Sequence, residues 1–377
     1  MASYHWKNRR IGVASGTWSI CSLSLSLCNS RLANADVHST PSSSSSSLPR
    51  DGVRVSHYPH KNADYRSHWA LKYDQRTRNP KWTYEHLYRS DFIQRESGNH
   101  DKADRKKAHF FPEHSIQNEK FKVISKDYSD SHYDRGHMIP AADFKITQRS
   151  LNSTFSMANI SPQYSSMNRG IWESLESFIR SLITAIEHPY EEVEVISGPV
   201  FAPVYSNGKW MYVHNTIGVF PKLITVPSHF FKVILCKRFV PLEHNPDIEI
   251  MSKAVAAFLV PNADTKMKDG KSLSSYVIRL DQLESLIGFT LFEDQISVKE
   301  KAECDAKIPA NKDLKILLSL DSEDKDRWIP MLESTGFGKE SSVVAPSKKN
   351  TDKDKVVTKF NHLCSVVNCN YCVPKSK

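Results

Sequence analysis

The most constraining feature of this 377-residue chain is one amphipathic segment, Asn168 to Glu187. Its apolar residues recur at intervals of three and four: Ile171, Trp172, Leu175, Phe178, Ile179, Leu182, Ile183 and Ile186. This spacing places them on one stripe of a helix, and such a stripe has to be buried against another element. The segment therefore predicts a helix that packs on the core of a folded domain.

Short runs of β-type sequence supply the surface on which that helix can pack. They begin at Phe121 (FKVIS), Glu192 (EVEVISGPVF), Trp210 (WMYVHNTIGVF), Phe230 (FFKVILC) and Ala254 (AVAAFLVP). Each run is bounded by Gly, Pro, Asn or charged residues, as strands usually are. A second helix is predicted at Leu280 to Ile287, ended by Gly288 as its C-terminal cap. The mixture indicates an α+β fold with a largely antiparallel central sheet and helices packed around it.

The N-terminal residues 1–38 have the composition of a targeting segment. Met1 to Ala35 contains no acidic residue, is rich in serine and carries Lys7, Arg9, Arg10 and Arg31, which is typical of a mitochondrial presequence. A secretory signal peptide is the alternative, because Ile11 to Cys28 is uncharged and Ala33-Asn34-Ala35 has the form of a cleavage site. Serines within the apolar run and Arg31 after it weaken that alternative.

Residues 39–52 are rich in serine and proline and are expected to form a linker. The folded domain is then expected at 53–293, followed by a lysine-rich, partly ordered C-terminal extension at 294–377. His362, Cys364, Cys369 and Cys372 near the end could offer four zinc ligands, but their spacing fits a reduced, unstructured tail better.

The charge balance points toward a polyanionic partner. The formal net charge is +9 and the sequence pI is about 9.0, whereas hydrophobic residues make up 39% of the chain, enough for a substantial core. A basic folded protein of this kind favours nucleic acid or an anionic membrane surface.

The segment Tyr133 to Asp143, YDRGHMIPAAD, contains the residues that phosphodiester hydrolysis requires. A neutral histidine can take a proton from water, which makes His137 the candidate general base. Arg135 can grip phosphate oxygens with its planar guanidinium, and Gly136 between them allows a tight backbone path. Without further support, the same residues would be read as a turn with a solvated histidine.

Asn168 and Glu176 supply that support, because they follow on the amphipathic segment. Eight residues along an α-helix leave two side chains roughly 80° apart around its axis. The Asn168 amide oxygen can ligate Mg²⁺, and Glu176 could accept a hydrogen bond from a water on that ion. The alternatives are an N-cap for Asn168 and a solvated helix face for Glu176.

Three motifs, DRGHMIPAADF, NISPQ and NRGIWESLE, resemble in order and spacing the signature of the DNA/RNA non-specific endonucleases, the ββα-metal nucleases. Further matches to the mitochondrial endonuclease G branch extend the resemblance over roughly residues 53 to 293. It implies a general base at His137, a metal ligand at Asn168, a nearby carboxylate at Glu176, phosphate-binding groups at Arg135 and Arg78, and supporting residues at Asp134 and Asn159. For Arg78, Arg76 in the same RTRN segment is the competing choice.

The resemblance also implies a cofactor, substrates and a location. We expect Mg²⁺, with Mn²⁺ as the alternative, and cleavage of DNA and RNA to 5′-phosphate products by a homodimer. The expected location is mitochondrial, in loose association with the inner membrane through the N-terminus. Similarity to the exonuclease-like paralogue leaves endonuclease and 5′-exonuclease action open. A secreted nucleotide-scavenging nuclease and a catalytically silent nucleic-acid-binding protein are the competing functions.

Overall fold

The computed structural model describes residues 53–58, 65–96, 103–186, 189–206, 209–242, 245–264, 273–308 and 359–362. The expected targeting segment, the whole of the expected linker and the cysteines Cys364, Cys369 and Cys372 lie outside these residues. In the described parts of the chain, the helices are too short or too polar to cross a lipid bilayer.

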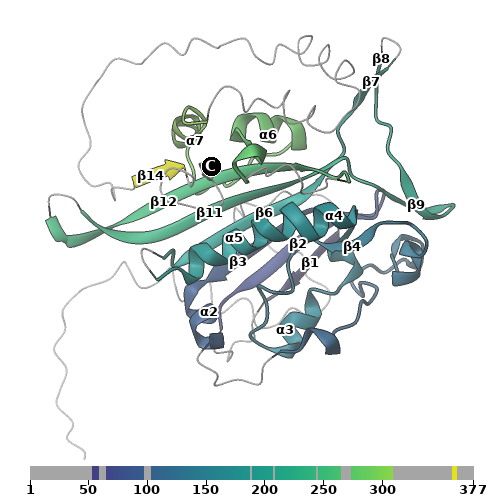
Figure 1. Ribbon diagram of the computed structural model, residues 1–377, viewed down its shortest axis with the longest axis horizontal. Coiled ribbons are helices and arrows are strands. Elements are labelled where there is room, and N and C mark those ends of the chain that lie inside the picture. Colours follow the sequence, from purple (N-terminus) through teal and green to yellow (C-terminus); the bar gives the residue numbers. More distant parts are fainter. Residues whose placement is uncertain are drawn as a thin grey trace, which may run out of the picture. The chain divides into compact units, whose positions relative to one another are not determined.

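An eight-stranded sheet forms the centre of the fold (Figure 1). Along the sheet lie β1 (Val53–His57), β2 (His68–Asp74), β3 (Asn79–Tyr88), β6 (Glu192–Val200), β11 (His229–Leu242), β12 (Asn245–Pro261) and β13 (Val277–Ile278), with β14 (Lys359–His362) also pairing with β12. Every pair is antiparallel except β12 with β14. The largely antiparallel central sheet is therefore confirmed.

Two hydrophobic cores lie on the two faces of this sheet. Strand β11 shows the division, because Phe230 and Ile234 belong to one core and Phe231 and Val233 belong to the other. Helix α5 (Glu173–Thr184) covers the first face, whereas α6 (Leu280–Ile287) and α7 (Val298–Asp305) cover the second (Figure 1). Burial on both faces explains why the sequence of β11 reads as a nearly continuous apolar run.

The predicted amphipathic helix is present, but its two ends differ from the prediction. Helix α5 buries five residues of the predicted stripe, Leu175, Phe178, Ile179, Leu182 and Ile183. It ends at Thr184, and Ile186 beyond it is 96% exposed. At the start, α4 (Ser165–Met167) leads into a π-helical segment, η5 (Asn168–Trp172), whose backbone departs from helical angles at Gly170. The chain from Asn168 is therefore not one regular α-helix.

Helix α6 has the predicted bounds, and Gly288 caps it in the left-handed conformation with φ of 76°. The packing continues past residue 293. The Asp305 carboxylate accepts hydrogen bonds from the backbone amides of Leu280 (2.7 Å) and Asp281 (3.1 Å), and Cys304 is buried in the core under α6. The folded unit thus includes residues up to Ile308.

One predicted strand is wrong, and a second is divided into two strands. The FKVIS run is not a strand: it begins at the end of the 3₁₀ turn η2 (Glu119–Phe121) and ends at the start of η3 (Ser125–Tyr128), with irregular chain between them. The Asn118 and Asp127 side chains accept hydrogen bonds from nearby backbone amides and favour turns there. The run from Trp210 splits into β8 (Lys209–Met211) and β9 (Thr216–Val219).

Three small hairpins and several short helices complete the described chain. The hairpins are β4 (Asp134–His137) with β5 (Ile160–Gln163), β7 (Val204–Ser206) with β8, and β9 with β10 (Lys222–Thr225). The short helices are α2 (Arg89–Glu96), α3 (Gln148–Ser153), η1 (Arg105–Lys107), η4 (Met157–Asn159) and η7 (Leu273–Tyr276).

Candidate active site

The β4–β5 hairpin carries the histidine singled out in the sequence. His137 pairs with Ile160 across this hairpin, at the end of β4. The fully buried Asn159 fixes the turn that follows, since its Oδ1 accepts from Ile139 N at 2.9 Å and its Nδ2 donates to Ile139 O at 3.0 Å. A further bond from Asn159 Nδ2 to Thr154 O, at 2.9 Å, ties this turn to the neighbouring segment. The backbone at His137 is thus held by its pairing with β5 and by the bonds from Asn159 to the next turn.

Five of the predicted site residues meet in one cavity of about 390 Å³. They are Asp134, Arg135, His137, Asn168 and Glu176, and the remaining lining residues are Arg105, Phe110, Pro140, Ala141, Ala142, Arg169 and Glu173. The cavity brings β4 together with the start of α5, although residues 138–172 separate the two elements in the sequence. Arg78 and Asn159 do not line it.

His137 lies in an apolar environment at the cavity wall. Its side chain is 9% exposed, and its ring is 5.5 Å from the ring of Phe110 and 4.8 Å from that of Phe155. Its Nε2 is buried and makes no hydrogen bond with any described residue. Burial, and secondly the positive charge of Arg105, lower the pKa of His137 to about 3. The imidazole is therefore neutral at physiological pH, with a lone pair available to accept a proton.

Asn168 is oriented by the hairpin across the cavity. Its Nδ2 donates to Asp134 Oδ2 at 3.0 Å, and Arg169 Nε donates to the same oxygen at 3.2 Å. The Asn168 side chain does not cap a helix, because the backbone preceding it is already helical. With its amide nitrogen bound to Asp134, Asn168 has its Oδ1 left to bind a ligand.

The positive charge of a buried lysine acts on Glu176. Burial raises the pKa of Glu176 to about 7, and Lys232 opposes that rise. Lys232 is fully buried on β11, with its Nζ 4.7 Å from the centre of the Trp172 ring and 3.8 Å from Glu85 Oε1. Trp172 Nε1 in turn donates to His137 O at 3.2 Å. The buried cation thus contacts the same helix start that borders the histidine.

Three arginines line the cavity of His137, and one of them, Arg169, is paired with Asp134. Arg135 donates to Ser125 Oγ, and its guanidinium lies 4.7 Å from the centre of the Phe110 ring. Arg105, which the sequence did not single out, lies 5.7 Å from the centre of the Phe155 ring. It belongs to a short run of three cations, and no motif distinguishes it from its two lysine neighbours. Only the folded chain shows that Arg105 faces the same cavity as His137.

Arg78 lies elsewhere and makes structural contacts. Its Nη1 donates to Leu223 O at 2.8 Å and its Nη2 to Lys120 O at 3.1 Å, so its guanidinium joins the β2–β3 turn to the β9–β10 hairpin. The competing candidate, Arg76, lines a separate cavity of about 700 Å³ between that turn and the end of α6. The structure brings neither arginine to the cavity of His137.

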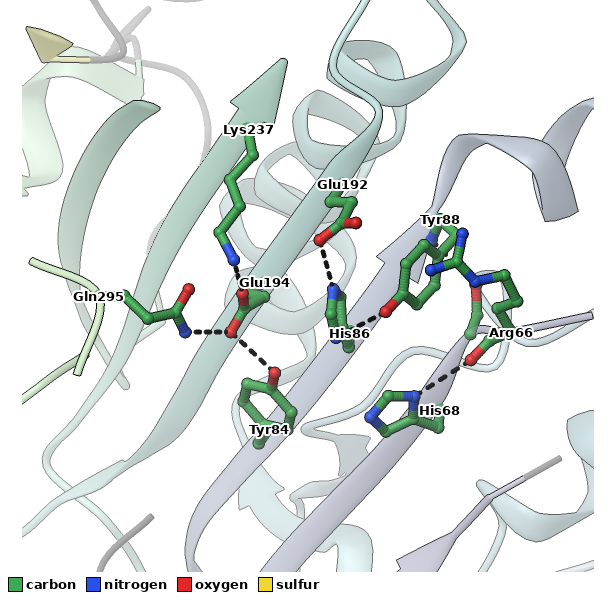
Figure 2. Close-up of polar contacts among 10 residues, drawn as sticks. Arg66, His68, Tyr84, His86, Tyr88, Glu192, Glu194, Lys237 and Gln295 are labelled. Carbon is green, nitrogen blue, oxygen red and sulfur yellow. Dashed lines mark hydrogen bonds and ion pairs between the residues drawn. The ribbon is translucent and has the colours of Figure 1, made fainter. Parts of the chain in front are cut away.

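A second group of possible metal ligands lies on the central sheet (Figure 2). Ligand atoms of His86, Glu192 and Glu194 are within 4.8 Å of one another. Their atoms are already bonded, however. His86 Nε2 is 3.1 Å from Glu192 Oε2, Lys237 pairs with one oxygen of Glu194, and Tyr84 OH and Gln295 Nε2 each donate to its other oxygen at 2.7 Å. This network ties β3, β6 and β11 to the segment after α6.

Comparison with known proteins agrees with this geometry. Residues 52–296 match the family model for DNA/RNA non-specific endonucleases. The chain is 33% identical over 261 residues to the mitochondrial nuclease of Saccharomyces cerevisiae, covering 65% of this chain and 74% of that protein. It is also 33% identical over 229 residues to human "Nuclease EXOG, mitochondrial", covering 60% of this chain but only 56% of the human protein.

A solved structure gives the same result at the level of the fold. The crystal structure of the EndoG/EndoGI complex superposes with a TM-score of 0.54 and 28% sequence identity, covering 67% of this chain and 90% of that chain. The predicted ββα-metal nuclease fold is confirmed by this likeness. Because the family model covers more than half of its residues, the chain belongs to the DNA/RNA non-specific endonuclease family of phosphodiester-cleaving enzymes.

Proposed function

We propose that this protein is a mitochondrial, Mg²⁺-dependent nuclease that hydrolyses DNA and RNA to 5′-phosphate products, with Mn²⁺ as an alternative metal. One observation carries the proposal: the cavity of about 390 Å³ brings a neutral His137, whose Nε2 has no hydrogen-bond partner among the described residues, together with Asn168, Glu176 and three arginines. These are the groups that water activation, metal binding and phosphate binding require.

His137 is proposed to act as the general base. Its buried Nε2 has a free lone pair and faces no competing donor among the described residues, so water in the cavity can donate to it. A pKa of about 3 makes it a weak base before substrate binds. An anionic phosphate beside the ring favours the protonated form and raises its basicity at the point of reaction. Asn159 and Trp172 hold the backbone of this segment in place.

The oxygen donors of the cavity fit a hard divalent cation. The Asn168 amide nitrogen donates to Asp134, so its Oδ1 is available to bind a cation. The Glu176 carboxylate lines the same cavity. Oxygen ligands of this kind suit Mg²⁺ or Mn²⁺. When bound, such an ion would stabilise negative charge on the phosphate and on the departing oxygen. Asn168 would hold it, Glu176 would orient nearby water, and Asp134 would keep the amide turned correctly.

Positive charge beside the histidine is proposed to bind the phosphate. Arg135 presents a guanidinium that Phe110 supports from one side, and Arg105 enters the cavity from η1. A guanidinium can donate two hydrogen bonds to one phosphate, which positions the reacting atom relative to His137. We assign the phosphate contact to Arg135 and Arg105, and we assign Arg78 to holding the β9–β10 hairpin.

The mitochondrial location rests on two observations. The relatives from Saccharomyces cerevisiae and from human are named as mitochondrial nucleases, and the N-terminus has the composition of a presequence. The homodimer, and a loose association with the inner membrane through residues 1–38, are part of the same proposal. Cell fractionation and sequencing of the mature N-terminus will test it, since export after cleavage at Ala35 would contradict a mitochondrial location.

Two substitutions test the catalytic assignment. His137→Ala removes the base and is expected to lower the rate of DNA and RNA cleavage about 10²- to 10⁴-fold. His114→Ala, which removes an exposed histidine stacked on Phe111, is the matched control and is expected to leave the rate unchanged. Full activity in His137→Ala would exclude this residue as the base.

Asn168→Ala tests the metal site with a readout that does not depend on turnover. Mg²⁺ should raise the melting temperature of the unsubstituted protein, and this increase should be lost in Asn168→Ala. An unchanged increase would place the metal elsewhere.

If the purified protein cleaves neither DNA nor RNA with Mg²⁺ or Mn²⁺, the competing function of a silent nucleic-acid-binding protein is supported. Product lengths on 5′-blocked and unblocked DNA will separate endonuclease from 5′-exonuclease action.

A further inference from the structure

The turn of the β9–β10 hairpin exposes two consecutive apolar side chains. Val219 is 81% exposed and Phe220 is 82% exposed. Isolated hydrophobic residues on a surface are common, but these two stand together where the paired strands turn. Neither residue has a part in the proposed mechanism. Val219 and Phe220 are called the hairpin tip below.

The base of the hairpin is held firmly. Ile217 and Ile224 are buried in a hydrophobic cluster that lies under the hairpin. Gly218 has φ of +89°, and a Cβ at this position would lie 2.7 Å from Lys222 O. Lys222 Nζ is 3.5 Å from Asp127 of η3. With its inner face buried and its strands fixed, the hairpin presents the tip outward.

Two connections join the hairpin to the cavity of His137. The turn η3 lies against β9, and its first residue, Ser125, accepts the hydrogen bond from Arg135. Phe110 lines the cavity and also packs against the hydrophobic cluster that contains Ile217 and Ile224. Figure 1 shows β4 and β9 toward the same side of the molecule. The tip is therefore placed by the same elements that place the active-site arginine.

Exposed cations lie on the turns next to the hairpin. Lys120 is the middle residue of η2, and its carbonyl accepts a hydrogen bond from Arg78. Lys126 is on η3. Both lysine residues are exposed. Cations beside an exposed aromatic ring are the two elements with which proteins hold a single nucleic-acid strand, the first for phosphates and the second for bases. The acids of the same turns are paired, Glu119 with Lys122 and Asp127 with Lys222. The charge of Lys120 and Lys126 therefore favours a nucleic acid over an apolar protein surface as the occupant of the tip.

We propose that the Phe220 ring, supported by Val219, stacks on a nucleobase of the strand whose phosphate enters the His137 cavity. This inference rests on the proposed nuclease function and adds a substrate contact outside the cavity. Every base offers a flat face, so stacking binds all sequences and does not select among them. Such a contact suits an enzyme of a non-specific family. It also predicts tighter binding where bases are unpaired.

The test compares strands with and without bases. Binding of fluorescein-labelled single-stranded DNA is measured by anisotropy in the full-length His137→Ala background, together with a strand of the same length made of abasic nucleotides. Phe220→Ala is expected to weaken binding of the normal strand about tenfold and to leave the abasic strand unchanged. Phe220→Trp should restore binding. Phe239→Ala is the control, since Phe239 on β11 is 57% exposed.

Three results would overturn the inference. Phe220→Ala could weaken both strands equally, or it could weaken neither. Light scattering could also show that Phe220→Ala changes the oligomeric state, in which case a second copy of the chain covers the tip. In the active protein, Phe220→Ala should raise KM for single-stranded DNA while kcat stays within about twofold. If the unsubstituted protein cleaves nothing, the proposed function fails, whereas the anisotropy comparison still decides the role of the tip.

Discussion

Gly136, between Arg135 and His137 on β4, leaves no room for a side chain. A Cβ built at this position would lie 1.9 Å from Gln163 Oε1, 2.2 Å from its Cδ and 2.5 Å from its Cγ. Gln163 is fully buried on β5, opposite Asp134. In Gly136→Ala, therefore, the Gln163 side chain has to leave its place or the hairpin has to open.

Both responses have a cost that can be measured. Overpacking of a buried site destabilises a protein by about 1–3 kcal/mol, which urea unfolding will detect. Any opening of the hairpin also moves Arg135 and His137, and a misplacement of about 1 Å can lower a catalytic rate about 100-fold. We expect Gly136→Ala to lose stability within that range and to lose single-turnover nuclease activity far more than other conservative changes on the hairpin.

A second substitution tests the reason for the loss. All three atoms nearest the added Cβ belong to Gln163, and its Oε1 and Nε2 make no hydrogen bonds with the described residues. Gln163→Ala removes those atoms, so the double variant Gly136→Ala/Gln163→Ala should regain about 0.5–3 kcal/mol relative to Gly136→Ala alone. If the double variant is no more stable and no more active than the single one, the collision with Gln163 is not the cause and this reasoning is refuted.

Three further predictions follow from the charges around the cavity. Arg105→Ala should lower kcat/KM for DNA about 100-fold. Arg78→Ala should instead cost about 1–3 kcal/mol of stability and have a smaller kinetic effect. Kinetics and urea unfolding are measured for both variants, and equal kinetic losses would contradict the assignment of the phosphate contact to Arg105. Lys232→Met leaves Glu85 buried without its cation and should destabilise the protein by about 3–5 kcal/mol, part of which Lys232→Met/Glu85→Gln should restore in urea unfolding. Glu176 has a raised pKa of about 7, so its carboxyl group keeps its proton below that pH. Calorimetry should therefore show that Mg²⁺ binds about tenfold more weakly at pH 6 than at pH 8. Glu176→Gln should remove this pH dependence.

The parts of the fold that follow from local pattern could be predicted from the sequence. Strands β6 and β11 are rich in β-branched and aromatic residues, β12 contains the apolar run AVAAFLVP, and α6 has both its apolar stripe and Gly288 after its last turn. Their structure depends on side chains within the element, which the sequence displays directly. The relation of His137 to Asn168 could be predicted only through the family resemblance, because it depends on how two distant segments pack.

Other features depend on contacts that the order of residues does not show. Phe121 lies in a run that looks like a strand, but side-chain bonds from Asn118 and Asp127 turn the chain there. Arg105 has two lysine neighbours, and only tertiary packing brings it to the histidine. Arg78 stands in a segment that matches the family, yet its guanidinium binds two carbonyl groups. In each case a long-range or side-chain contact outweighs the local pattern.

The π-helical segment at Asn168–Trp172 sets the angle around the helix axis between the Asn168 amide and the Glu176 carboxylate. In an uninterrupted α-helix, eight residues would leave Asn168 and Glu176 about 80° apart. A π-turn accommodates one extra residue, so the rotation is close to that of seven residues and the two side chains are only about 20° apart. Straightening this segment into a regular α-helix without removing a residue would rotate Asn168 by about 100° and leave the two side chains about 80° apart. The π-turn, as much as the identity of its residues, therefore keeps the Asn168 amide and the Glu176 carboxylate on one side of the helix.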